Sequence, residues 1–168
     1  HPRGGMGGTG GKARIVGGGV GTMPILNYTT SIDPHRTVGE IQKMLAAAGA
    51  RGVGIEYDQA GDPIAVAFQL NVNGLLGYRL PCRTDKVFTV LQRQHKAGKI
   101  ERRYTTKEHA QRVAWRIVKD WLEAQLAIIQ SEMVEVTEVF MPYQLMASGQ
   151  TMYEVMQHKL LTGPVEEE

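Results

Sequence analysis

Apolar and polar residues alternate along most of residues 53–81, which predicts β-strands rather than helices. The turn-forming run Asp58–Pro63 divides this stretch, and Asn73-Gly74 reverses the chain a second time. The alternating apolar residues are Val53, Ile55 and Tyr57 before the first turn, and Ile64, Val66, Phe68 and Leu70 after it. With Leu75 to Pro81 following the second turn, three consecutive antiparallel strands are expected.

The register of the second hairpin follows from keeping one face apolar. A two-residue Asn-Gly loop would pair Phe68 with Arg79 and would scatter apolar groups over both faces. A three-residue loop, with Gly74 in a left-handed bulge position, instead pairs Phe68 with Tyr78 and gathers the apolar groups. The same register pairs Leu70 with Leu76 and Val66 with Leu80, and leaves Glu56, Ala65, Ala67, Gln69, Asn71 and Arg79 on the opposite face.

The flanking segments predict one more strand and several helices. Residues 25–32 also alternate, which favours a further strand from Ile25 to Ile32. Thr37-x-x-Glu40 has the pattern of a capping box and predicts a helix that ends at Gly49. A short helix is expected from Thr84 or Asp85 to Gly98.

The C-terminal half is expected to be mainly helical. Thr105-x-x-Glu108 is a second capping-box pattern, and the apolar spacing after it predicts a long helix over Thr106–Met133. Residues 134–140 could extend that helix or form a short strand, and a last helix is expected from Gln150 to Leu161. The fold class is therefore α+β: an antiparallel sheet of three to four strands packed on one face by helices.

Composition divides the chain into two parts. Residues 1–22 hold ten of the 20 glycines, which predicts a leader or tag remnant before Met23, or else a native flexible arm. Residues 23–168 are expected to form a single α+β domain with an acidic C-terminal segment. Cys82 is the only cysteine, so no intrachain disulfide is possible and a cytoplasmic protein is expected. No run of apolar residues is long enough to predict a membrane span.

Charge is strongly segregated along the sequence, although the net charge is only +2. From Lys86 to Lys119 there are ten basic residues against two acids, and from Asp120 to Glu168 nine acids against one lysine. Clustered positive charge predicts an anionic partner, of which nucleic acid is the commonest. Single-stranded DNA or RNA is the expected partner, held without sequence specificity.

The candidate nucleic-acid-binding residues are Arg79, Arg93, Lys96, Lys99, Arg102, Arg103, Tyr104, Lys107, Arg112, Arg116 and Lys119. Basic side chains one helical turn apart can contact neighbouring phosphates, and Tyr104 could stack on an unpaired base. The structural alternative is a solvated helix face, with Tyr104 packed beside a helix start. Phe68, Tyr78, Tyr28 and Tyr57 would lie on the apolar sheet face, where they could stack on RNA bases or, as binary patterning favours, pack in the core.

Self-assembly is the alternative function. The basic block of one protomer could contact the acidic C-terminal segment of another, which would suit a structural or regulatory protein. Five methionines near the C-terminus suit either an adaptable homo-oligomer interface or a core, and they are Met133, Met141, Met146, Met152 and Met156.

Enzymatic function is not predicted, and no cofactor is expected. The histidines have no metal-ligand spacing, and nothing near Cys82 marks a nucleophile, so a buried inert thiol is expected there. A second alternative is a metal-dependent nuclease, since Glu56 and Asp58 lie two apart on a strand and could share a Mg²⁺ ion. Acids beside a tight turn, however, are commonly there for backbone reasons.

From Met23 onward the chain resembles a group of small phage and prophage proteins of unassigned function. The resemblance is carried by MPILNYTTSID, by RVAWRIVKDWLEAQLAII, and by VFMPY followed by GQTMYE. It implies a phage setting and no particular activity. Together with the basic block, it favours a DNA-handling protein in the host cytoplasm, by association rather than by mechanism.

Overall fold

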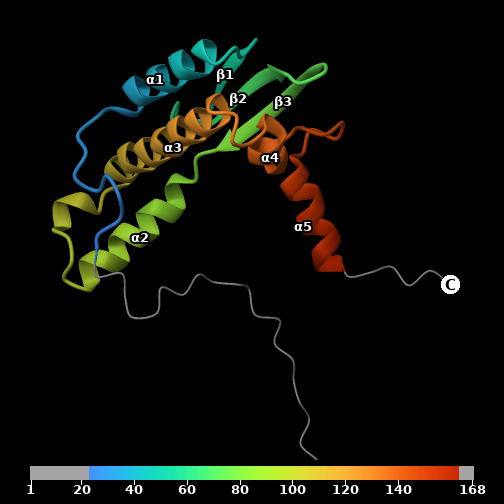
Figure 1. Ribbon diagram of the computed structural model, residues 1–168. Helices are drawn as coiled ribbons and strands as arrows, with labels where there is room; N and C mark the ends of the chain where they lie inside the picture. Colours follow the sequence, from blue (N-terminus) through green and yellow to red (C-terminus); the bar gives the residue numbers. More distant parts are fainter. Residues whose placement is uncertain (1–22, 163–168) are drawn as a thin grey trace, which may run out of the picture.

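A computed structural model describes residues 23–162, and the glycine-rich segment 1–22 lies outside the described residues (Figure 1). The elements in chain order are α1 (Pro34–Ala47), β1 (Val53–Tyr57), β2 (Pro63–Asn71), β3 (Leu75–Pro81), α2 (Thr84–Lys96), the 3-10 turn η1 (Arg102–Tyr104), α3 (Lys107–Gln130), α4 (Val136–Phe140), the 3-10 turn η2 (Met141–Tyr143) and α5 (Met152–Thr162). This combination confirms the α+β prediction.

The three strands form one antiparallel sheet in the order β1-β2-β3. Phe68 pairs with Tyr78, as the three-residue loop requires, and Leu70–Leu76 and Val66–Leu80 follow in the same register. Asn73 and Gly74 both adopt positive φ, 56° and 128°, and the side chain of Asn71 accepts a hydrogen bond from the Gly74 amide. The predicted hairpin register is confirmed.

The predicted strand over Ile25–Ile32 is wrong, so the described sheet has three strands and not four. The segment forms two consecutive turns, closed by hydrogen bonds from Tyr28 N to Ile25 O and from Thr30 N to Asn27 O. Asn27 is left-handed, with φ 63°. The segment lies against α2 and α3 instead of a sheet edge, because the Ile25 amide donates to the Gln94 side chain and the Asn27 side chain donates to Asp120.

Three helix starts differ from the expected ones by one to four residues. Asp33 caps α1 in place of Thr37 by accepting from the His35 amide, because Pro34 has the φ that a first helical residue requires. Thr106, and not Thr105, caps α3 by accepting from the His109 amide. At α2 the cap position is Arg83, without a side-chain hydrogen bond, and Thr84 and Asp85 are already helical.

The sequence left open whether residues 134–140 extend the long helix or form a short strand, and the structure shows neither. Glu132 has φ 62°, so α3 ends at Gln130 and residues 136–140 form the separate helix α4 and not a strand. The last helix is present, as expected, over Met152–Thr162. In Figure 1, α5 leads away from the rest of the domain.

The helices pack in layers on the sheet. α1 packs against β1 and β2 and against α3, and α2 packs on the other flank of α3 (Figure 1). The main core joins these elements and α4 through Ile41, Leu45, Val66, Phe68, Tyr78, Trp115, Leu122 and Phe140. A second, smaller cluster lies between α2 and α3 around Leu91, Ile100 and Ala110.

The expected set of four aromatic residues on one sheet face is only half formed. Phe68 and Tyr78 stack at 5.5 Å between ring centroids and are buried, so the core interpretation is confirmed for them. The register shifts between Glu56 and Tyr57, and the Tyr57 ring is 50% exposed and stacks near His35. Tyr28 lies outside the sheet, so a sheet platform for RNA bases is absent from the described residues.

Between residues 23 and 162, no helix has both the length and the hydropathy needed to cross a bilayer.

Candidate nucleic-acid interface

The eleven candidate residues do not form one continuous surface. Some lie exposed along α2 and the connector after it, and others are engaged in packing α3 or the sheet. They differ in burial and in the partners that their side chains already have.

Two cations of α3 are already paired with carboxylates of the same chain, which disfavours the phosphate contacts predicted for them. The Arg116 guanidinium lies 2.5 Å from Glu40 of α1 and 3.4 Å from the Thr37 hydroxyl, and its side chain is 15% exposed. Lys119 donates to Glu123 one turn further along α3, and its side chain is 18% exposed. Both face the α1–α3 junction, where burial favours an ion partner.

Arg112 and Arg79 are also engaged within the protein. The Arg112 guanidinium lies 3.4 Å from Nδ1 of His109, and its Nε is buried. Arg79 spans the polar face of the sheet to Glu56, with 2.7 Å between Nη2 and the carboxylate. Neither residue extends the predicted cationic surface, because Arg112 lies against His109 of the same helix and Arg79 is paired with Glu56 of β1.

Tyr104 packs inside the domain, so the structural alternative is confirmed for this ring. Tyr28 meets it edge-on at 5.3 Å between centroids, and His109 lies 5.1 Å away. The Arg103 guanidinium covers the ring at 4.7 Å. A base could stack on Tyr104 only after displacing one of these neighbours.

Lys107 is exposed but lies in an acidic environment. It lines a cavity of about 270 Å³ with Asp58, Asp62 and Asp85. Three carboxylates around one ammonium group repel a phosphate, so Lys107 is a poor phosphate ligand. Lys99 is half-buried and already engaged with a neighbouring group, which also separates it from the exposed cations.

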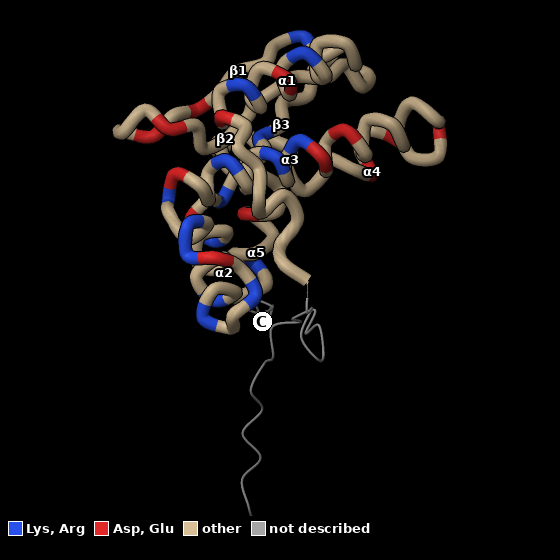
Figure 2. Tube along the Cα trace, turned by 90° about the vertical axis from the view of Figure 1, so that its left-hand side faces the viewer, with Lys and Arg blue, Asp and Glu red and all other residues tan. Residues whose placement is uncertain are grey.

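The remaining candidates share one exposed surface with two cations that the prediction had not included. We call this surface the basic stripe, and it consists of Arg83, Lys86, Arg93, Lys96, Arg102 and Arg103. Lys86, Arg93 and Lys96 fall within an arc of about 80° on α2, at 3.6 residues per turn. Figure 2 shows Lys and Arg gathered around α2 and its C-terminal connector.

Most cations of the basic stripe have no carboxylate partner among residues 23–162. The exception is Arg103, which pairs with Glu101 at 2.9 Å while both side chains remain largely exposed. The helical spacing of Lys86, Arg93 and Lys96 could have identified the stripe from the sequence. Arg83 could not have been assigned to the basic stripe from the sequence, because its position depends on how β3 leads into α2.

The structure does not support a metal site at Glu56 and Asp58. The Glu56 carboxylate pairs with Arg79, and Asp58 accepts from the Asp62 amide within the turn. The register shift after Glu56 also interrupts the strand between the two acids. In the part of the chain that the structure describes, no group of three or more His, Cys, Asp or Glu could hold a metal ion.

Cys82 is buried at the end of β3, as expected for an inert thiol. Burial raises its thiol pKa to about 12. The thiolate is the nucleophilic form, so Cys82 stays unreactive at neutral pH.

Comparison with known proteins adds no family: no family model, curated protein or solved structure matches this chain. The resemblance to phage and prophage proteins therefore stays a prediction.

Proposed function

We propose that this protein binds single-stranded nucleic acid without sequence specificity, through the basic stripe. The observation that carries the proposal is the row of exposed cations on one side of α2, continued by Arg102 and Arg103. Lys86 and Lys96 are about 15 Å apart along the helix, at 1.5 Å per residue. Such a row can neutralise several successive phosphates of one strand and release their counterions.

The proposal needs no catalytic group and no cofactor. Side chains on the outside of a helix contact phosphates, which carry no sequence information. Preference for a single strand would come from aromatic side chains that stack on unpaired bases, a contribution that duplex DNA cannot offer.

Charge reversal within the basic stripe tests the proposal. Two double variants each reverse part of the stripe's charge. One is Arg93→Glu with Lys96→Glu, and the other is Arg102→Glu with Arg103→Glu. Each should abolish the binding of a labelled dT20 oligonucleotide at low salt, measured by fluorescence anisotropy. The first should leave the melting temperature nearly unchanged, because Arg93 and Lys96 are exposed. The second should lower it only slightly, because Arg103 also gives up an exposed pair with Glu101 and its contact with the Tyr104 ring.

The matched control reverses the same amount of charge away from the basic stripe, with Lys43→Glu and Arg51→Glu, both exposed. The control should retain most of the affinity. Equal losses in control and test variants would show a net-charge effect and contradict a defined interface. Absence of wild-type binding at low salt would overturn the proposal itself.

Self-assembly is a second candidate, favoured by the exposure of large apolar side chains at the C-terminal end. Leu160 and Leu161 of α5 are 78% and 77% exposed, and Met133, Met141, Met146 and Met156 are also exposed. Exposed apolar groups of this kind suit a homo-oligomer interface. Light scattering at low and high salt separates two modes of self-assembly. Contacts between basic and acidic segments weaken with salt, whereas apolar contacts do not.

A further inference from the structure

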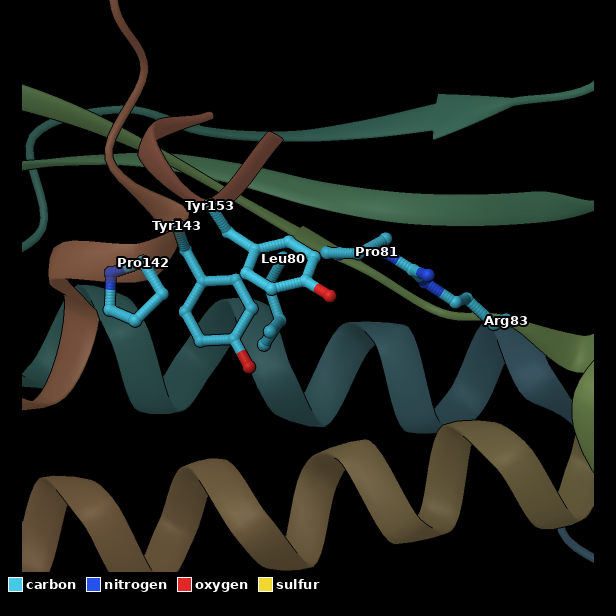
Figure 3. Close-up of a pocket in the computed structure, with 6 residues that line it drawn as sticks. All are labelled: Leu80, Pro81, Arg83, Pro142, Tyr143 and Tyr153. Carbon is cyan, nitrogen blue, oxygen red and sulfur yellow. The ribbon is translucent and has the colours of Figure 1, made fainter. Parts of the chain in front are cut away.

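An open groove lies at the N-terminal end of α2, and Arg83 is the one residue of the basic stripe that lines it. Its volume is about 300 Å³, at the lower limit of small-molecule sites. Three separate elements form it, since β3 ends there, η2 crosses it and α5 begins beside it. The lining residues are Leu80, Pro81, Arg83, Pro142, Tyr143 and Tyr153, all drawn in Figure 3.

The two tyrosines provide aromatic surface at one end of the groove (Figure 3). Tyr143 is half-buried, and its ring meets Trp121 of α3 edge-on at 5.7 Å between centroids. Trp121 in turn contacts the buried ring of Phe140, so Tyr143 is supported from the core. Tyr153, on the first turn of α5, is 50% exposed and accessible to a ligand.

Arg83 provides the positive charge at the other end of the groove. It is exposed, has no carboxylate partner among residues 23–162, and is the first cation of the basic stripe. The nearest acid in sequence, Asp85, lines the separate cavity beside Lys107 and so faces elsewhere. The groove therefore has aromatic surface at one end and an unpaired positive charge at the other.

We propose that this groove holds one unpaired base of the bound strand, stacked on Tyr153 beside Tyr143, with an adjoining phosphate at Arg83. Stacking on an aromatic ring tolerates any base, since every base has a π-face, and Arg is well suited to phosphate. This inference rests on the proposed function and assigns the stacking role predicted for Tyr104 to different tyrosines. Aromatic grooves also bind proline-rich peptides, but a phosphate strand is favoured because Arg83, an unpaired cation of the basic stripe, lines the groove.

Three substitutions test the groove, with fluorescence anisotropy of labelled dT12 at low salt as the first measurement. Tyr153→Leu should weaken binding roughly 5- to 150-fold, in line with the loss of one stacked base. Tyr153→Phe should keep near wild-type affinity, because the ring and not the hydroxyl stacks. Tyr57→Leu is the matched control, since Tyr57 is equally exposed and does not line the groove, and it should have no effect.

Two further probes separate the base from the phosphate. An abasic oligonucleotide of the same length should bind wild type and Tyr153→Leu equally, since only a base can use the ring. A dT12 strand carrying 5-iodouracil should photo-crosslink to Tyr153 or Tyr143, as located by mass spectrometry of the digested conjugate.

The outcomes distinguish this inference from the proposed function. If wild type binds dT12 in a salt-dependent way but Tyr153→Leu binds equally well, the groove inference is overturned and the proposed function stands. If wild type binds no oligonucleotide, both fail. If a proline-rich decapeptide, and not dT12, perturbs the Tyr153 NMR signals, the groove is a peptide site and the inference is overturned.

Discussion

The Arg116 guanidinium of α3 lies 2.5 Å from the Glu40 carboxylate of α1, and this ion pair joins the two helices that cover the sheet. Arg116 belongs to the basic block by sequence, yet its side chain is mostly buried and serves packing. Positive charge in this protein therefore has two uses. Arg79 of the sheet and Arg116 of α3 hold elements together, whereas most cations of α2 and its connector face solvent.

Removing the Arg116 guanidinium should destabilise the fold without changing nucleic-acid binding. Arg116→Ala leaves the partly buried Glu40 with only the longer and more exposed pair to Arg36, at 3.6 Å, so we expect a loss of about 1–2 kcal/mol in the free energy of unfolding. Urea denaturation measures this loss, and a double variant with Glu40→Gln should lose less than the sum of the single losses. A large drop in oligonucleotide affinity at unchanged stability would contradict the packing role.

Neutralising two cations of the basic stripe should reduce the salt dependence of binding. Each phosphate contact to a single strand contributes about 0.7 to the slope of log K against log salt concentration. Arg93→Gln with Lys96→Gln should therefore lower that slope by about 1.4 in a salt titration of dT20 binding. Lys119→Gln, which removes a cation paired with Glu123, should leave it unchanged. Equal slopes in all three proteins would rule out phosphate contacts by Arg93 and Lys96.

Removing the Tyr78 hydroxyl should stabilise the protein or leave it unchanged. Tyr78 is fully buried, and its hydroxyl has no hydrogen-bond partner within residues 23–162. A buried hydroxyl without a partner costs roughly 1–3 kcal/mol, so Tyr78→Phe should raise the free energy of unfolding by up to about that amount. Thermal and urea denaturation measure the change. A loss of more than about 1 kcal/mol would reveal an interaction of the hydroxyl instead.

Alkaline pH should destabilise the fold through Cys82. Burial raises the pKa of its thiol from 9.0 to about 12. Between those values the unfolded chain loses a proton that the folded protein retains, so stability is full below pH 9 and falls as pH rises toward 12. The expected slope is about 1.4 kcal/mol per pH unit.

A Cys82→Ala variant isolates the cysteine from other alkaline effects. Burial also raises the pKa of Tyr78, which adds its own loss of stability above pH 10.0. Urea denaturation at pH 8, 9 and 10 should therefore show a shallower decline in Cys82→Ala than in wild type. Parallel declines would mean that the Cys82 thiol ionises normally in the folded protein.

Local sequence patterns were sufficient for the sheet and for the existence of most helices. The register of β2 and β3 follows from one constraint, that Phe68 and Tyr78 share an apolar face, and the left-handed Gly74 satisfies it locally. A helix over 107–130 follows from its apolar spacing in the same way. Such features depend on neighbours in sequence, so they can be derived without coordinates.

Alternation alone failed at Ile25–Ile32, because a strand also needs an available partner. The Tyr28 carbonyl instead accepts a hydrogen bond from the buried His109 ring, 81 positions further along the chain, at 2.5 Å. Such a contact depends on where α3 lies relative to the N-terminal segment. No local pattern in residues 25–32 contains that information.

The sequence by itself determined that positive charge is concentrated between residues 86 and 119, and that part of it lies on one side of a helix. Only the tertiary structure decided which of those charges face solvent. Arg116 has its partner in α1 and Arg79 in β1, so long-range packing withdraws them from the surface. The groove that Arg83 lines together with Tyr143 and Tyr153 likewise joins residues about 60 to 70 positions apart. Hydrophobic periodicity acts between near neighbours, whereas the pairing of buried charge requires the assembled fold.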